Sequence, residues 1–128
     1  MRLLVIAARA DYRLLVKKHA EIEWPDVKLV EHRLGDDNPL DAQFAAVGFD
    51  AVIIVAAPPT AAAEALAAEL AAKPEFAPIV LILLKDTPNP KPSASRGVHR
   101  LYGRKIDRDL LVRAIEAASR EHKQALSR

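Results

Sequence analysis

The feature that most constrains this chain is the alternation between short apolar runs and longer segments with a helical pattern. Three runs, at Leu3–Ala7, Asp50–Ala57 and Ile79–Leu84, consist almost entirely of Leu, Val, Ile and Ala. Such runs are typical of strands in a parallel sheet, because helices cover both of its faces. A helical pattern follows each of the first two runs, so the sequence predicts repeated βα units.

Two further segments have weaker strand patterns. Val27–Leu34 alternates and carries Glu31, His32 and Arg33, which indicates a more exposed strand near the edge of the sheet. Gly97–Tyr102 is short and follows the third apolar run along the chain. Together with the three apolar runs, these segments predict a sheet of five strands.

Helical patterns lie between and after the strands, over residues 12–23, 40–47, 61–72 and 108–123. Asp11, Thr60 and Asp107 are suited to cap three of them, and Gly48 is suited to end another. The residues expected to face the sheet are Leu15, His19 and Ile22 in the first helix, and Leu111, Ile115 and Ala118 in the last.

The fourth βα unit departs from this pattern. Lys85–Arg96 contains Pro88, Pro90 and Pro92. Alternating prolines are incompatible with the interior of a helix and favour an extended chain. We therefore expect helix 4 to be shortened or replaced by a Pro-rich loop.

The order of elements predicts a flavodoxin-like, doubly wound α/β fold with a five-stranded parallel sheet in the order 2-1-3-4-5. The length of 128 residues suits one domain, which we place at 1–123, with 124–128 as the start of a linker or tail. Hydrophobic residues make up 51% of the chain but aromatic residues only 5%, so the core must be aliphatic.

Composition argues against several classes of protein. There is no cysteine, which excludes disulfides and thiolate chemistry. The apolar N-terminal stretch soon meets Arg9 and is far shorter than the roughly 18 residues of a membrane span, so we expect a cytoplasmic protein. The net charge of +2 makes a nucleic-acid partner an unfavoured prediction.

No motif for catalysis or cofactor binding is present. The four histidines, at positions 19, 32, 99 and 122, do not form a zinc pattern. The four glycines, at positions 35, 48, 97 and 103, cannot build a glycine-rich phosphate loop. We predict no enzymatic activity, no cofactor and no metal site.

The spacing of these segments resembles that of response-regulator receiver domains over nearly the whole chain. The segments that carry the resemblance are Leu3–Ile6, Asp50–Ile54, Pro78–Ile82, Gly97–Tyr102, Arg104–Asp107 and Asp109–Leu111. In that family, two acids after strand 1 and an aspartate ending strand 3 hold Mg²⁺, and that aspartate accepts a phosphoryl group. A Ser or Thr after strand 4 and a Lys after strand 5 contact the phosphate.

Mapped onto this chain, the family's phosphorylation site is degenerate. The acid pair corresponds to Ala7 and Ala8, and the phospho-acceptor corresponds to Val55. The hydroxyl corresponds to Leu83 or its neighbour Leu84, and only the basic residue is kept, as Arg104 or Lys105. Without the carboxylates, the resemblance implies a pseudo-receiver that forms neither the Mg²⁺ site nor the acyl phosphate.

Basic residues gather near the fifth strand and the start of the last helix. The predicted interaction patch comprises Arg96, Arg100, Tyr102, Arg104, Lys105 and Arg108. Its alternative interpretation is an ordinary solvated rim. In receiver domains, the face formed by helix 4, strand 5 and helix 5 commonly mediates dimerisation or partner binding, so the resemblance implies that role here. Arg9 and Arg13, near the end of the first strand, are a second candidate for holding an anion.

The sequence and the resemblance together predict a phosphorylation-independent module that acts by protein–protein interaction or dimerisation. We expect it to be the N-terminal regulatory domain of a larger bacterial signalling protein, such as a kinase, a cyclic-di-GMP enzyme or a transcription regulator. The alternative is a ligand-sensing module that binds a nucleotide or another anion through the basic residues Arg96, Arg100, Arg104 and Lys105. A small α/β enzyme of another type is the third hypothesis.

Overall fold

The computed structural model describes residues 1–33, 49–57, 61–71, 79–84, 94–95, 98–103 and 105–126. The strands are β1 (Arg2–Ala7), β2 (Lys28–Arg33), β3 (Ala51–Ala56), β4 (Ile79–Leu84), β5 (Ala94–Ser95) and β6 (Val98–Gly103). The helices are α1 (Ala10–Glu23), α3 (Ala61–Ala71) and α4 (Arg108–Leu126). The predicted helix 40–47 and the caps at Gly48 and Thr60 lie outside the described residues.

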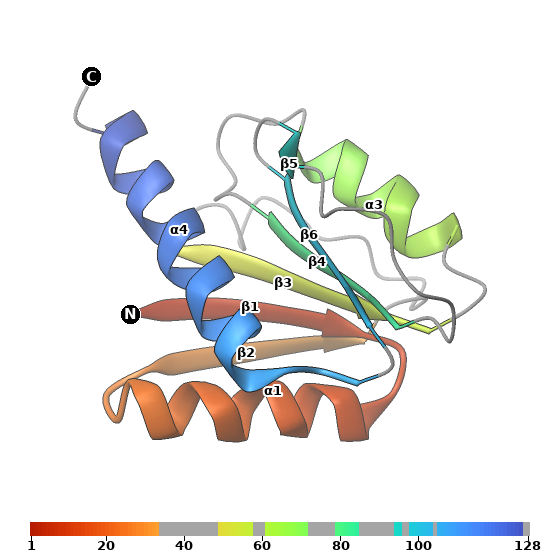
Figure 1. The fold of residues 1–128 in the computed structure, drawn as a ribbon, viewed down its shortest axis with the longest axis horizontal. Helices are drawn as coiled ribbons and strands as arrows, with labels where there is room; N and C mark the ends of the chain where they lie inside the picture. The colour runs from red at the N-terminus through yellow and green to blue at the C-terminus, as the bar shows by residue number, and fades with distance from the viewer. Residues whose placement is uncertain are drawn as a thin grey trace.

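The strands form one sheet in the order β2-β1-β3-β4-β6-β5 (Figure 1). The four strand pairs that run from β2 through β1, β3 and β4 to β6 are all parallel. When β6 is counted as the fifth parallel strand, their order is 2-1-3-4-5. This confirms the predicted flavodoxin-like, doubly wound sheet. The two-residue β5 pairs antiparallel with the start of β6 and adds a short outer strand that the sequence did not predict.

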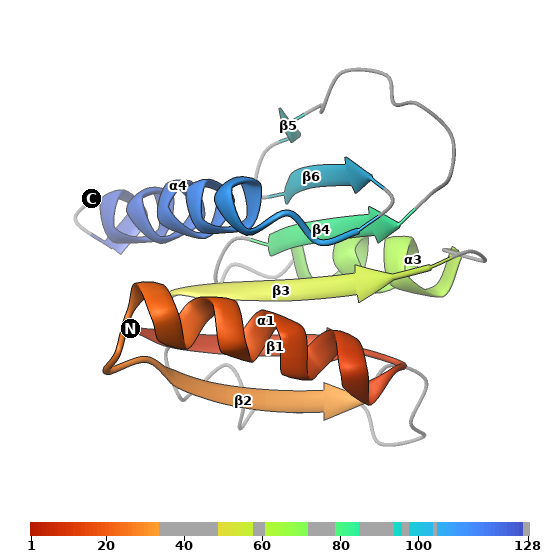
Figure 2. The same cartoon turned by 60° about the horizontal axis from the view of Figure 1, so that its bottom comes forward.

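Alternate residues of each central strand enter different halves of the core. Leu3 and Val5 of β1 pack on the side covered by α1 and α4, whereas Leu4 and Ile6 pack on the side of α3. Figure 2 shows α1 and α4 on one face of the sheet and α3 on the other. Every residue of β3 and β4 is buried, as expected for strands in the middle of a parallel sheet. β2 has a mixed pattern, which confirms its predicted edge position.

The buried face of α1 differs from the predicted one. Leu15 and Ile22 are 37% and 60% exposed, and the fully covered residues are Val16 and Ala20. The buried face follows every fourth residue from Tyr12 to Trp24. Tyr12 and Trp24, the first and last residues of this series, are partly buried and pack against the same core. The predicted stripe was wrong by one position around the helix.

The start of α1 is also different. The residue before the helix is Arg9, which has an extended backbone and makes no side-chain capping bond, so Asp11 is not the N-cap. Asp11 lies in the first turn, where its carboxylate accepts a hydrogen bond from the Tyr12 amide at 3.1 Å. A negative charge in the first turn still stabilises the helix through the helix dipole.

The last helix follows the prediction closely. Asp107 caps α4 by accepting a hydrogen bond from the Leu110 amide at 3.1 Å. The predicted stripe of Leu111, Ile115 and Ala118 is fully buried. The helix continues to Leu126, so residues 124–126, which were expected to begin a linker, belong to α4.

The Pro-rich segment is described only in part. Residues 85–93 lie outside the described residues, so the predicted loss of helix 4 stays a prediction. Ala94 and Ser95, also within the segment Lys85–Arg96, form β5. Within the described part of the chain, no helix combines the length and apolarity needed to cross a membrane.

Candidate functional site

The carboxyl edge of the sheet is where the resemblance places a phosphorylation site. The register aligns Ala7 of β1 with Val55 of β3, and both side chains are fully buried on the side of α1 and α4. Leu84 of β4 joins the same cluster, whereas Leu83 faces the α3 side. Of the two leucines that the resemblance matched to the family's hydroxyl position, Leu84 is therefore the one that lies on the same side of the sheet as Ala7 and Val55. These side chains offer no oxygen ligand to a cation.

Ala8, which the resemblance matches to the second acid of the family's pair, is exposed just after β1. Lys105 is exposed two residues after β6, and Arg104 lies outside the described residues. The structure thus brings Ala7, Val55 and Leu84 together and leaves Ala8 at the rim.

A guanidinium group lies at this edge. Nη1 of Arg13 donates a hydrogen bond to the carbonyl oxygen of Ala7 at 2.6 Å. Its Nε lies 3.5 Å from Oε1 of Glu31 on β2. The Arg13 side chain is only 16% exposed, against 43% for Glu31, so most of the cation is shielded from water. The Arg13 side chain, from the first turn of α1, therefore connects the last residue of β1 with Glu31 of β2.

Arg13 has this position because of the helical phase of α1. It lies one residue after Tyr12 and three before Val16, on the flank of the buried face that is turned toward β2. Arg13 is one of the two arginines predicted to hold an anion, and the structure gives it a carbonyl and a carboxylate as partners. An anion here would have to displace Glu31.

Arg9 is also paired. It makes two hydrogen bonds to Asp11, from Nε at 3.1 Å and from Nη2 at 2.8 Å. Its guanidinium carbon lies 4.8 Å from the ring centre of Tyr12, within the range of a cation–π contact. The hydrogen bond and charge of Asp11 raise the pKa of Arg9. These contacts occur among exposed groups and do not form an enclosed anion site.

The basic residues near β6 divide between the two faces of the sheet. Arg100 aligns with Leu81, on the α3 side, and its Nη1 lies 3.7 Å from Oε1 of Glu64 on α3. Arg108, at the start of α4 on the other side, lies 3.9 Å from Oε2 of Glu23 on α1. The structure therefore does not unite these two members of the predicted patch on one surface.

The remaining members of the predicted patch are only partly described. Arg96 and Arg104 lie outside the described residues. The backbone of Tyr102 belongs to β6, and its side chain lies outside the described part. The proposed interaction role of these residues stays a prediction.

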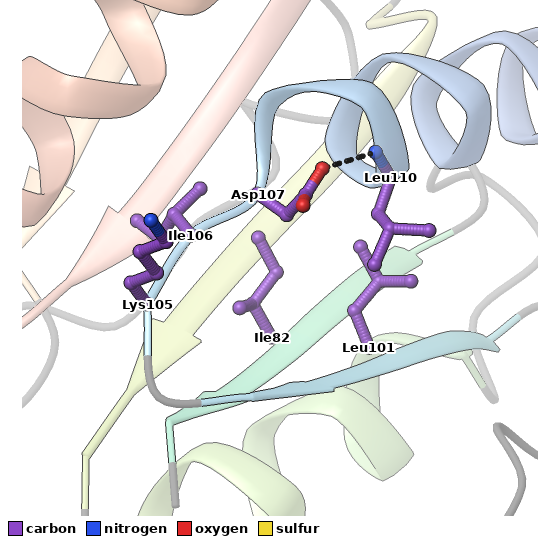
Figure 3. A pocket seen from close by; sticks show the side chains of 6 residues that line it. All are labelled: Ile82, Leu101, Lys105, Ile106, Asp107 and Leu110. Atoms are coloured by element: carbon purple, nitrogen blue, oxygen red, sulfur yellow. Dashed lines mark hydrogen bonds between the residues drawn. The ribbon is translucent and has the colours of Figure 1, made fainter.

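A small depression lies between β6 and the start of α4, lined by Ile82, Leu101, Lys105, Ile106, Asp107 and Leu110 (Figure 3). The space inside it is about 10 Å³, enough for about one water molecule. A nucleotide needs a cleft of roughly 300 Å³ or more. This depression therefore gives no support to the alternative of a nucleotide-sensing module.

Two histidines have surroundings that the sequence did not predict. Nε2 of His99 on β6 lies 2.9 Å from Oε2 of Glu121 on α4. Nδ1 of His19 on α1 is buried and has no hydrogen-bond partner among the described residues. Burial lowers the pKa of His19, and the nearby charge of Arg108 lowers it further, against an opposing effect of Asp107. The His99–Glu121 contact has no sequence motif, because its two residues come from elements that are distant in the chain.

In the part of the chain that the structure describes, no group of three or more His, Cys, Asp or Glu side chains is placed to hold a metal ion. No protein-family model matches the chain, and no curated protein matches its sequence. The fold and the residues at the carboxyl edge of the sheet therefore carry the functional argument.

Proposed function

We propose that this chain is a pseudo-receiver, a domain of receiver-like fold that signals by binding other proteins without being phosphorylated. The observation that carries the proposal is the carboxyl edge of the sheet. Ala7 and Val55, which the resemblance matches to a metal ligand and the phospho-acceptor, are apolar and fully buried, and Arg13 donates a hydrogen bond to the carbonyl of Ala7.

The chemistry of phosphoryl transfer needs the opposite arrangement. A divalent cation requires several oxygen ligands, and carboxylates supply most of them in sites of this kind. Here two described carboxylates, Asp11 near the end of β1 and Glu31 on β2, are paired with Arg9 and Arg13. A metal ion at this edge would meet a shielded guanidinium instead of free carboxylates, and like charges at short range repel. Val55 has no atom that accepts a phosphoryl group.

The partner in this proposal is either an adjacent output domain or a second copy of the chain, in a bacterial cytoplasmic signalling protein. The proposed contact face, called the β6–α4 face, lies around β6 and the start of α4. Exposed Lys105 gives positive charge to the segment between these two elements. Arg100 adds a cation only for a partner that also reaches the α3 side of β6, where its Nη1 lies 3.7 Å from Glu64. Such charge favours a partner with acidic groups, because complementary potentials speed association and select partners.

The phosphorylation half of the proposal is tested by an NMR titration with Mg²⁺ and beryllofluoride, using an active receiver domain as the positive control. We expect no shift at Ala7, Ala8 or Val55 in the wild-type chain. We expect none in Arg13→Ala either, because removing the cation does not supply carboxylates. A saturable shift at this edge in either protein would refute the proposal.

The binding half is tested by sedimentation of the chain alone over a range of concentrations, which detects association with a second copy. We expect Arg100→Glu and Lys105→Glu to weaken association. The matched control is Lys17→Glu, a charge reversal at an exposed position of α1. Association that persists in both variants, or that falls equally in the control, would move the contact away from the β6–α4 face. Calorimetry with a nucleotide panel separates this function from ligand sensing.

A further inference from the structure

The side of α4 that faces away from the sheet carries a row of charged side chains. The row, called the α4 charge row, comprises Asp109, Arg113, Glu116 and Arg120. Its spacings of four, three and four residues keep all four side chains on one side of a helix. Three of them are exposed and Glu116 is partly exposed. Figure 1 shows α4 in front of the sheet, so this side of the helix is turned to the viewer.

The α4 charge row has no ionic partner within the described part of the chain. Arg108 and Glu121, on the flanks of the same helix, contact Glu23 on α1 and His99 on β6. By contrast, no member of the row makes an ion pair or a side-chain hydrogen bond among the described residues. The fold therefore uses the charges on the flanks of α4 and leaves those on its outer side for a contact with another molecule.

The signs in the row alternate from negative at Asp109 to positive at Arg120. Read from the other end, the row has the same spacings and the opposite sign at each position. In an antiparallel pair of such helices, Asp109 therefore lies opposite Arg120 of the second copy, and Arg113 lies opposite Glu116 of the second copy. A parallel pair would place like charges opposite each other, which is unfavourable. The charge pattern thus fits a second, antiparallel copy of the same helix.

Apolar surface lies beside the row, on the flank of α4 that is turned toward β6. Leu110 is 45% exposed and lines the depression next to β6 (Figure 3). Ala117, about two turns later on the same flank, is partly exposed. Each of these residues directly follows an acidic member of the row. The antiparallel arrangement that matches the charges therefore also brings Leu110 of each copy close to Ala117 of the other.

We propose that α4 pairs antiparallel with α4 of a second copy of the chain, through the α4 charge row and the flank that carries Leu110. This inference rests on the proposed function, because it names a second copy as the partner of the binding module. A contact made by one helix is smaller than the roughly 800 Å² per partner of a standard interface, and its ion pairs are exposed. We therefore expect a weak dimer with a dissociation constant of about 1 mM, which takes effect where two copies are held close together.

Charge exchange between two variants tests the pairing. Arg113→Glu places glutamates opposite each other in a homodimer, and Glu116→Arg places arginines opposite each other, so each variant alone should associate more weakly than the wild-type chain. In a mixture of the two, every opposed pair again has opposite signs. We expect the mixture to associate at least about tenfold more tightly than either variant alone, measured by NMR titration at about 0.15 M salt.

The matched control is a mixture of Lys17→Glu with Glu116→Arg. Lys17→Glu changes the net charge as much as Arg113→Glu does, but at an exposed position of α1. This mixture should show no gain over Glu116→Arg alone. If circular dichroism shows that one of the α4 variants is unfolded, the mixture of Arg120→Glu with Asp109→Arg tests the outer pairs in the same way.

A spin label determines the orientation of the two helices. The chain has no cysteine, so Gln124→Cys, at an exposed position near the end of α4, gives a single attachment site. In a mixture with isotope-labelled wild-type chain, antiparallel pairing predicts broadening of the amides around Lys105, at the start of the partner helix. Broadening confined to the end of the partner helix would contradict the proposed orientation.

Two results of the mixing experiment would overturn the proposal: no gain in the mixture of α4 variants, or an equal gain with Lys17→Glu, which would reflect net charge alone. Self-association that Lys105→Glu weakens and Arg113→Glu leaves unchanged would also refute pairing through α4, and it would leave the proposed function standing. A saturable shift with Mg²⁺ and beryllofluoride would instead refute the proposed function without bearing on how α4 pairs.

Discussion

Replacing Arg13 by Met tests whether the guanidinium at the carboxyl edge stabilises the fold. Met keeps an unbranched stem of similar bulk, so the packing against α1 and β1 should change little. The variant loses the hydrogen bond from Nη1 to the Ala7 carbonyl at 2.6 Å and the contact with Glu31 at 3.5 Å. The experiment therefore removes the cation and its two contacts while leaving most of the apolar packing in place.

The expected loss follows from those two contacts. A hydrogen bond that involves a charged group contributes about 1.5–3 kcal/mol to stability. The ion pair with Glu31 adds little, because that carboxylate is 43% exposed and pairs near the surface contribute about 0–1 kcal/mol. We expect a decrease of about 2 kcal/mol in the free energy of unfolding at pH 7. For a chain of 128 residues, this corresponds to a melting temperature lower by about 7 °C.

The assay is urea and thermal unfolding followed by circular dichroism, with Arg9→Met as the matched control. Arg9 lies just before the same helix, but its side chain is 63% exposed and so is its partner Asp11, at 59%. The control should melt with the wild-type chain. If Arg13→Met lost less than about 0.5 kcal/mol, the usual range of a surface substitution, the guanidinium would not be a structural part of the edge. Equal losses in both variants would also contradict the reasoning.

Substitutions at three further positions test other parts of the fold by urea unfolding. Asp107→Ala removes the cap of α4 and should cost about 1 kcal/mol, whereas Asp107→Asn should keep most of the stability; equal losses would show that the cap bond is unimportant. Ile115→Ala empties a fully buried position between α4 and the sheet and should cost about 2–5 kcal/mol; a loss below that of Asp107→Ala would contradict the packing. Val30→Thr, on the outer strand β2 at 39% exposure, should stay within about 0.5 kcal/mol. A larger loss of unfolding free energy would indicate that the Val30 side chain is more deeply buried than its exposure shows.

The pH dependence of stability has a defined sign at His19. Its pKa is lowered in the folded chain, so folding favours the neutral imidazole. This contribution is complete above the ordinary histidine pKa of about 6.5 and is lost as the pH falls below it toward the folded value. Urea midpoints at pH 7.5 and 5.5 should therefore converge in His19→Gln compared with the wild-type chain. A wild-type decrease that the variant reproduces in full would place the acid sensitivity elsewhere.

The strands of the central sheet could be predicted because their environment leaves little choice of residue type. β3 and β4 are buried on both faces, so every side chain must be apolar, and the apolar run marks the strand directly. The phase of α1 could not be fixed in the same way. Its sequence offers two apolar stripes, and only the sheet decides that Val16 and Ala20 are covered while Ile22 remains 60% exposed.

The sequence was sufficient to predict that apolar side chains lie together at the carboxyl edge of the sheet. Ala7 and Val55 follow from the strand positions alone, since the ends of parallel strands meet at one edge. The position of Arg13 depends on the helical phase that the sequence left open. In the observed phase of α1, Arg13, which was proposed to hold an anion, donates to the Ala7 carbonyl and pairs with Glu31.

The same dependence on three-dimensional phase explains why Arg100 and Arg108, two members of the predicted patch, lie on opposite sides of the sheet. Their closeness in sequence suggested one patch, but successive residues of a strand point to opposite faces. His99 and Arg100 are neighbours in the chain, yet they contact Glu121 on α4 and Glu64 on α3, on opposite sides of the sheet. A partner that bound only the α3 side would meet Arg100 without His99. Two single variants, one with charge reversal at Arg100 and one with His99 substituted, therefore distinguish which face of this edge the partner uses.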